Sequence, residues 1–494
     1  MAETHTPATN VAVAEDGAVH ETTNERPRTA AEALRKLWTP KKLGIAISGL
    51  LVMNFFMNFT SYTQNVYEPY ATSHFQGHSL LTTGSIINGI VRIVSYPLLA
   101  KLADHFGRPQ GFAGAALSMA IGNMMFAACQ NVDTFLAGGI FDSFGDTWWN
   151  ITQQIFIADV TSLVNRGILF TLPESITAIP TLYAGTYLGE HILLTPLPTI
   201  AIMIWMGRRP NAWSSSASVS SLMHGAPSGP VGKAKHLATE LDLIGAFLLI
   251  GGLSMTLLPI TIAGRRDTDK WKEASSIVLI IVGVLTFVAF LVWDYKYATK
   301  PIIPYRTMRA RNVIIACASA CFIAMSDIKS LLGVGRGLAQ VSLQVALQAA
   351  VGNEEIAVAT AVYLSSLGFG SNLGTTISGG IWNSILPRKL RAKFPAAEAR
   401  KIFGSIVVAQ NYTIGSVERD DINEAYRETQ QTLAIGSLCV GTVLVLLAWL
   451  AQNVKLGEED EKRAVQADEE LAWAVKARDA EGGEQLDELG RERK

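Results

Sequence analysis

Acidic side chains within apolar stretches are the first candidates for chemistry in this sequence. Asp142 and Asp146 lie four residues apart in one such stretch, so both carboxylates fall on one face of a helix. Arg92 lies in an earlier apolar stretch, and Glu174 and Glu190 lie in and just beyond the following one. Charges inside a bilayer are costly, and a carboxylate there can bind and release a proton. These five residues predict a proton or substrate path, with structural pairing of Arg92 to an acid as the alternative.

Aromatic and amide side chains follow the two acids closely. They are Trp148, Trp149, Asn150, Gln153 and Gln154. Indole rings and amides can both line a substrate path, so we add this set to the candidate substrate or proton path. The alternative is that the two tryptophans only pack or anchor their helix.

Two short polar turns predict a contact at one end of the apolar stretches. The first contains Asp104, Gly107 and Arg108, and its basic residues place it on the cytoplasmic side. The second contains Asp159 and Arg166. We expect Arg108 to form an ion pair with Asp159. We term these five residues the inner-gate motif, because such a pair would hold an inner gate in one of two helix arrangements.

Other classes of site find no support in the sequence. Cys317 and Cys321 are four residues apart, but no histidine or acid is spaced to complete a metal site, so we expect all four cysteines to be small core residues. The run Gly333–Gly337 lacks the third spaced glycine, the preceding strand and the later acid of a nucleotide loop. The net charge of −1 gives no argument for nucleic acid. We predict no metal, no cofactor, no nucleotide and no enzymatic activity.

The elements that must position these residues are apolar helices. Hydrophobic residues make up 49% of the 494 residues and charged residues only 17%, which is typical of a polytopic membrane protein. We predict an all-α fold with about twelve transmembrane helices and both chain ends in the cytoplasm. The predicted spans are 43–61, 80–99, 112–129, 134–158, 168–188, 192–206, 241–263, 275–293, 313–325, 331–351, 357–381 and 433–450.

Composition divides the chain into segments. They are a disordered cytoplasmic N-terminus (1–40), a first helix bundle (41–209), a cytoplasmic linker (210–240), a central helix pair (241–295), a second helix bundle (296–454) and a charged cytoplasmic tail (455–494). Glycines in the span 357–381 favour close contacts between helices. Parity places the polar loop 382–431 outside although it is rich in Lys and Arg. Asn411, in the triplet Asn-Tyr-Thr, would be a glycosylation acceptor there.

Several stretches together resemble a known family. They are Tyr67–Ser73, the turn with Asp104 and Arg108, Gln153–Arg166, Leu332–Gly337 and Gly379–Trp382. In this order they resemble the fungal siderophore-iron transporter family, a branch of the major facilitator superfamily. The resemblance implies two six-helix bundles with an extra helix pair between them, fourteen helices in all. It also implies import of ferric siderophores coupled to protons, with substrate bound at the bundle interface near the membrane midplane.

The sequence departs from the family pattern in two places. The region Glu190–Leu197 is shortened, which accounts for the short sixth span. Within Phe322–Leu332 the family would have two further helices, so the second bundle is predicted to be incomplete, with about 12 helices in the chain against 14 in the family. The resemblance further implies that Asp104 lies near the N-terminus of the span 357–381, where a negative charge is favoured.

Three functions remain open at this stage. The first is a proton-coupled importer of ferric siderophores, whose partners are the siderophore, protons and the lipid bilayer. The second is an exporter of drugs or small peptides such as glutathione by proton exchange. The third is a truncated family member that transports nothing, motivated by the missing segment. A multi-pass location in the plasma membrane is expected, with endosomal or vacuolar membranes as alternatives.

Overall fold

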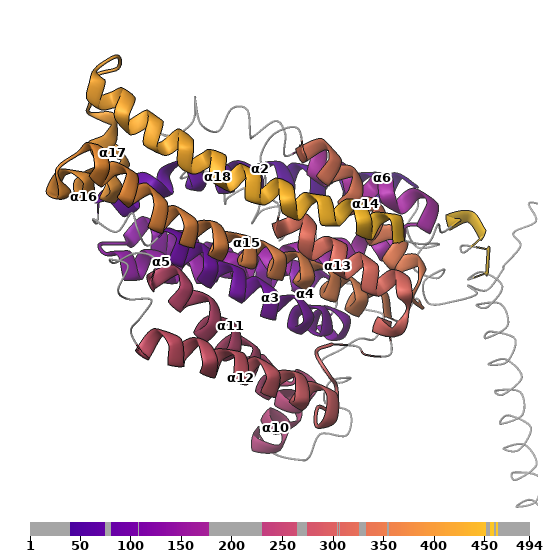
Figure 1. Cartoon of the computed structure of the whole chain (residues 1–494). Helices are drawn as coiled ribbons and strands as arrows, with labels where there is room; N and C mark the ends of the chain where they lie inside the picture. Colours follow the sequence, from indigo (N-terminus) through magenta and orange to yellow (C-terminus); the bar gives the residue numbers. More distant parts are fainter. Residues whose placement is uncertain are drawn as a thin grey trace, which may run out of the picture.

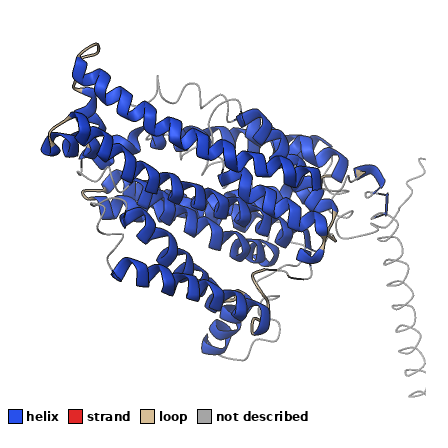
Figure 2. Cartoon of the chain, viewed as in Figure 1, coloured by secondary structure: helices blue, strands red, loops and turns tan. Residues whose placement is uncertain are grey.

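The structure is a computed structural model of the chain. It describes residues 40–74, 81–106, 108–176, 230–263, 274–303, 305, 307–325, 332–352, 355–450, 455–458 and 461–462. Within these ranges every regular element is a helix, and most of the helices run alongside one another (Figure 2). The predicted all-α class is confirmed.

The first bundle contributes five described helices. They are α2 (Pro40–His74), α3 (Leu81–Phe106), α4 (Arg108–Ala128), α5 (Val132–Val160) and α6 (Leu163–Ile176). We call the end where α3 meets α4 the inner end, because the basic turn there predicts a cytoplasmic location. The Asn131 side chain at the opposite, outer end accepts a hydrogen bond from the Thr134 backbone N–H at 2.8 Å and so caps α5.

The later helices form a central pair and a second bundle. They are α10 (Pro230–Glu240), α11 (Leu243–Ala263), α12 (Ala274–Lys296), η5 (Thr307–Arg309), α13 (Arg311–Met325), α14 (Leu332–Ala349), α15 (Ile356–Lys393), α16 (Ala396–Gly404), α17 (Ile406–Gln410) and α18 (Val417–Leu450). The central pair is α11 and α12, and Figure 1 shows it beside the remaining helices.

By length and hydropathy, seven helices of the described part could cross a membrane. They are α2, α3, α4, α11, α12, α15 and α18. The predicted count of about twelve is therefore not confirmed. α13 has 15 residues, fewer than the roughly 20 that a spanning helix needs. The predicted span 192–206, the later part of 168–188 and most of the linker 210–240 lie outside the described residues, as do residues 1–39 and nearly all of the charged tail.

Helix α15 packs against helices of both bundles. Against α13 the approach is so close that a Cβ added to Gly370 would lie 1.9 Å from the Cys321 carbonyl oxygen. Against α3, the Asn372 side-chain amide donates a hydrogen bond to the Ile86 carbonyl oxygen at 3.3 Å. The close contacts predicted from the glycines of this span are confirmed.

The segment 382–431, which we call the outer cap, is largely helical rather than the predicted polar loop. α15 continues to Lys393, α16 and α17 follow, and α18 begins at Val417, at the left end of Figure 1. The outer cap has an apolar core of Leu386, Leu390, Phe394, Ala399, Ile402, Ala409, Ile422 and Ala425. These residues recur at helical spacing within a polar average composition, so composition alone does not reveal the helices.

Acidic residues of α18 neutralise basic residues of the outer cap. Lys389 forms an ion pair with Glu428, and the Lys393 Nζ lies 2.7 Å from the Asp421 Oδ1. Lys393 also pairs with Glu424. These ion pairs join the end of α15 to the start of α18 within the outer cap.

The cysteines differ in burial. Cys317 is buried in α13, whereas Cys439 is exposed on α18. The expectation of four core cysteines is therefore wrong for Cys439. Its apolar neighbours on α18 are exposed too, with Leu438 at 59% and Leu446 at 65%, as expected for a helix that faces lipid.

Candidate functional site between the helix bundles

One arginine faces two acids inside the first bundle. The Arg92 Nη2 lies 3.2 Å from the Asp146 Oδ2, with 47% and 33% of the two side chains exposed. Asp142, one turn earlier on α5, also attracts the Arg92 guanidinium. The two carboxylates and the guanidinium carry a combined charge of minus one, and one bound proton would make the group neutral. The arrangement fits both predicted alternatives. Arg92 and Asp146 form a structural ion pair, and Asp142 beside them could accept a proton.

Amide side chains link α2, α5 and α14. The Asn54 side chain donates to the Gln153 Oε1 at 2.6 Å, which joins α2 to α5. The Gln344 amide of α14 donates to Gln154, which in turn donates to the Asn150 Oδ1 at 3.4 Å. Three of the predicted ligand-contacting residues therefore lie in one polar layer that crosses from the first bundle to the second.

Both tryptophans pack inside the first bundle. The Trp149 ring lies 4.7 Å from the Phe112 ring, and only 3% of the residue is exposed. The Trp148 ring meets the edge of the Phe144 ring at 5.8 Å. This placement favours the packing role of the two indoles over contact with a ligand.

The predicted ion pair at the inner end is present. The Arg108 Nε donates to the Asp159 Oδ2 at 3.0 Å, and the Arg108 Nη1 donates to the Ala103 carbonyl oxygen at 2.6 Å. These contacts tie the start of α4 to the ends of α3 and α5. All three helices belong to the first bundle, so the pair braces that bundle and does not itself cross to the second.

Arg166 makes the contact that crosses between the bundles. It is 2% exposed, and its Nη2 donates to the carbonyl oxygens of Ala158 and Thr161 at 2.8 and 3.2 Å. Its Nη1 donates to the Gln348 Oε1 of α14 at 3.2 Å. Gln348 in turn donates to the Thr360 hydroxyl of α15 at 2.8 Å. The inner end of the first bundle is thus joined to two helices of the second.

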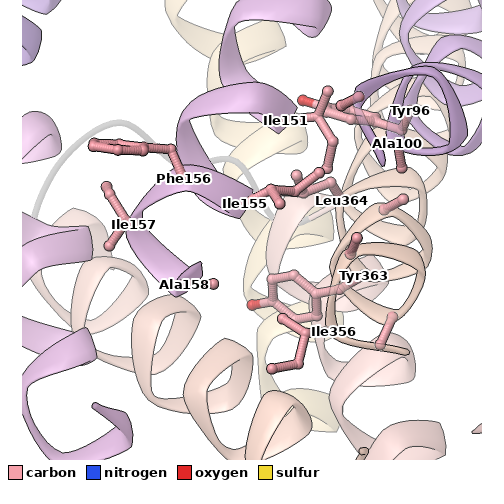
Figure 3. Close-up of a cluster of buried hydrophobic side chains, with 14 of the residues drawn as sticks. Tyr96, Ala100, Ile151, Ile155, Phe156, Ile157, Ala158, Ile356, Tyr363 and Leu364 are labelled. Carbon is pink, nitrogen blue, oxygen red and sulfur yellow. The ribbon is translucent and has the colours of Figure 1, made fainter. Parts of the chain in front are cut away.

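An apolar cluster lies beside this polar contact. Figure 3 shows Ile151 and Ile155 of α5 close to Leu364 of α15, with Tyr96 of α3 nearby. Tyr363 is fully buried there, and its hydroxyl donates to the Gln340 carbonyl oxygen at 2.7 Å. Side chains from both bundles therefore pack together between α3, α5 and α15 at the inner end.

Some predicted site residues lie outside the described part of the chain. They are Gly107, Glu190 and the side chains of Asp104 and Glu174. The expected position of Asp104 near the start of α15 therefore stays a prediction.

Sequence reasoning missed the glutamines of α14. Gln340, Gln344 and Gln348 recur every four residues within an apolar run, which places them on one face of the helix. This four-residue spacing is the feature of the sequence from which a polar face on α14 could have been predicted. Their partners are far away in sequence, since Gln348 and Arg166 are separated by 182 residues.

Comparisons with known proteins cover most of the chain. A sequence profile of the Major Facilitator Superfamily matches residues 45–375. The chain is 27% identical to the siderophore iron transporter mirC of Emericella nidulans, over 87% of each chain. It is 26% identical to siderophore iron transporter 1 of Schizosaccharomyces pombe, over 78% of each chain.

Solved structures match more weakly. A bacterial homologue of the human lysosomal transporter Spinster is 12% identical, with a TM-score of 0.44, over 84% of this chain and 98% of that one. The human organic anion transporter MFSD10 is 14% identical, with a TM-score of 0.33, over 76% of this chain and 99% of that one. TM-scores this low carry no inference.

Proposed function

Because the chain belongs to the major facilitator superfamily, we propose that it imports ferric siderophores across the plasma membrane, coupled to protons, by alternating access. The polar layer that joins α5 to α14 is the observation that carries the proposal. Relatives named siderophore iron transporters, similar over most of the chain, supply the substrate class.

The polar layer is the proposed substrate contact. A ferric siderophore is a bulky chelate with many oxygen acceptors, and neutral amides can bind it without taking an unpaired charge into the membrane. Asn150, Gln154 and Gln344 come from helices of both bundles, so a ligand bound among them would contact both halves. A ligand held by both halves can favour a different arrangement of them, as alternating access requires.

The acids beside Arg92 are the proposed proton site. A proton on Asp142 or Asp146 would cancel the surplus negative charge of the three groups. Proton binding would therefore change how strongly α5 is held to α3, because Arg92 belongs to α3 and both acids belong to α5.

The inner contacts are the proposed closed gate. Arg166 and Gln348 link the two bundles, while the Arg108–Asp159 pair braces the first bundle next to them. Opening toward the cytoplasm would break the link between Arg166 and Gln348 and separate the apolar cluster of Figure 3.

A non-transporting role is the second candidate, and the length of the chain favours it. The described residues of α13 rise only about 22 Å, less than the roughly 30 Å of a bilayer core. The alignment with the Emericella nidulans relative extends over 532 positions, and 87% of this 494-residue chain fills about 430 of them, so about 100 have no counterpart here. The predicted shortened region Glu190–Leu197 and the predicted incomplete second bundle would both leave unmatched positions of this kind.

Uptake of radiolabelled iron by cells that lack their own siderophore carriers tests the proposal. Cells expressing the chain should accumulate iron from a ferric hydroxamate siderophore, and cells expressing Gln154→Leu should accumulate much less. A Gln130→Leu variant, changed at an exposed turn, is the matched control and should behave like the parent. Faster loss of preloaded substrate from expressing cells would instead support export, and no flux in either direction would support the non-transporting role.

A further inference from the structure

The central helix pair lies across the seam between α3 and α15. Its apolar face buries Leu249 and Leu253 of α11 and Phe290 of α12 against Ile86, Ile90 and Ile93 of α3. Phe369 and Leu373 of α15 pack against the same cluster. The pair therefore touches one helix from each bundle, and any rocking of the bundles must move it relative to at least one of them.

A lysine of α3 anchors the inner end of the pair. The Lys101 Nζ donates to the Lys300 carbonyl oxygen at 2.8 Å and lies 3.5 Å from the Glu240 carbonyl oxygen. The Lys300 Nζ closes this group through an ion pair with the Glu240 carboxylate at 2.5 Å. Lys101 thus holds the segment before α11 and the segment after α12 at one point on the first bundle.

Two buried aspartates stiffen the anchor. The Asp294 carboxylate accepts hydrogen bonds from the backbone N–H groups of Ile302 and Ile303 at 2.6 and 3.2 Å. Asp242, directly before α11, accepts a hydrogen bond from the Trp293 indole N–H of α12 at 3.0 Å.

The charged groups around the anchor act on one another. Burial, followed by the nearby Asp294 carboxylate, raises the pKa of Tyr305 to about 12, so the Tyr305 hydroxyl keeps its proton and can donate a hydrogen bond. The carboxylates of Asp242, Asp294 and Glu240 also attract the Lys101 ammonium group.

The contact with α15 is of a different kind. The Phe287 and Phe369 rings stack at 6.3 Å with an interplanar angle of 15°. Toward the outer end, a Cβ added to Gly380 would lie 3.9 Å from the Ile260 side chain, an ordinary van der Waals distance. Stacked rings and a glycine surface can shift while remaining in contact. Removing the Lys101 ammonium group would instead break its hydrogen bond to the Lys300 carbonyl oxygen and take a positive charge away from the nearby buried carboxylates.

We propose that Lys101 is a positioning residue that fixes the central helix pair to the first bundle, so that the pair moves with that bundle while α15 slides along it. The inference rests on the proposed alternating access. It assigns a mechanical role to two helices that contribute no residue to the polar layer.

Reversible cross-links test this assignment in a cysteine-free parent. Ile260→Cys with Gly380→Cys bridges the pair to α15. Gly251→Cys with Thr286→Cys bridges α11 to α12 and is the matched control, since the Gly251 Cβ would lie 3.7 Å from the Thr286 methyl group. Thr82→Cys with Gly379→Cys bridges α3 to α15, because the Gly379 Cβ would lie 3.5 Å from the Thr82 Cβ.

The proposal requires that the first bridge lowers siderophore uptake on the order of tenfold, reversibly with reductant, while the control bridge stays within about twofold of the parent. If the bridge between Thr82→Cys and Gly379→Cys blocks uptake but the bridge between Ile260→Cys and Gly380→Cys leaves it full, the role assigned to Lys101 and the central pair is wrong.

If the bridge between α3 and α15 also leaves uptake intact, the bundles do not rock during transport, and the proposed alternating access is wrong.

Distances between spin labels provide a readout that needs no transport. One label at Ser275→Cys on α12 is paired with Gln130→Cys in the first bundle or with Ser384→Cys on α15, all three being exposed positions. Across acidic and neutral pH, the first distance should keep one narrow distribution and the second should broaden or split. Lys101→Ala should broaden the first distance, whereas Lys296→Ala, at an exposed lysine, should not. Equal broadening of both distances in the parent would refute the assignment, as would an α12–α15 distance that never changes.

Discussion

At the scale of single residues, Arg166 makes the hydrogen bond that joins the two bundles at the inner end. It is almost fully buried, and it donates hydrogen bonds to two backbone carbonyl groups and to the Gln348 side-chain amide. A buried cation that binds oxygen dipoles in this way can exchange one of them for water when the bundles part. The residue therefore suits a contact that must be both specific and breakable.

Replacing Arg166 should weaken both the fold and the gate. Arg166→Ala removes three charge-assisted hydrogen bonds and leaves the Gln348 amide without this partner, so we expect a loss of roughly 3 kcal/mol. Thermal unfolding of the detergent-solubilised protein measures the loss as a lower midpoint. Thr171→Ala, at an exposed position of the same helix, is the control. An unchanged midpoint for Arg166→Ala would contradict the role assigned to its hydrogen bonds.

The Arg108–Asp159 pair should control access to the inner end. Asp159→Asn weakens the brace between α4 and α5, so a buried reporter at Val351→Cys should react several times faster with a maleimide added from the inner side. Asp133→Asn, at an exposed position in the first turn of α5, is the matched control. If Asp159→Asn and the parent are labelled at the same rate, the Arg108–Asp159 pair does not control access to the inner end.

At the scale of helices, close glycine contacts set the position of α15. Gly370→Ala would drive its Cβ into the Cys321 carbonyl group, and the resulting overpacking should cost about 1–3 kcal/mol. Gly380→Ala, ten residues further along, meets only an ordinary contact and should be neutral. Thermal unfolding of the two variants compares them directly. Equal stability would mean that α13 and α15 do not pack as closely as described.

The outer cap should carry a glycan. Asn411 is exposed in the turn between α17 and α18, beyond the apolar half of α18, and its triplet is usable only outside the cell. Protein from a eukaryotic host should therefore run faster on a gel after treatment with an N-glycosidase, and Asn411→Gln should already run at that faster position. Ser384→Ala, at another exposed position of the outer cap, should keep the shift. A parent protein insensitive to the enzyme would argue against placing the outer cap outside.

Sequence reasoning succeeded where local patterns decide the outcome. The Arg108–Asp159 pair could be predicted because both residues lie in short polar turns at the same end of adjacent helices. The link between Arg166 and Gln348 could not, since it depends on how two bundles dock. The outer cap was misjudged because its helices are amphipathic and polar on average, so a search for apolar runs passes over them.

At the scale of the whole molecule, the closed inner end and the charged group in the first bundle form one working hypothesis. Protons that reach Asp142 and Asp146 would change the hold of α5 on α3, and α5 also carries the polar layer that meets α14. Binding of substrate and proton would thus act on the same helix. The predicted incomplete second bundle is the feature that challenges this view, and the described residues of α13 rise less than a bilayer is thick.

The most direct measurement is uptake of a radiolabelled ferric siderophore by purified protein in liposomes with a more acidic outside. We predict accumulation inside that a protonophore abolishes and that Asp142→Asn lowers on the order of tenfold, while the exposed Asp133→Asn does not. Accumulation that is the same with and without the pH gradient would contradict proton coupling. No accumulation by protein that folds and unfolds cooperatively would contradict transport itself and leave the non-transporting role.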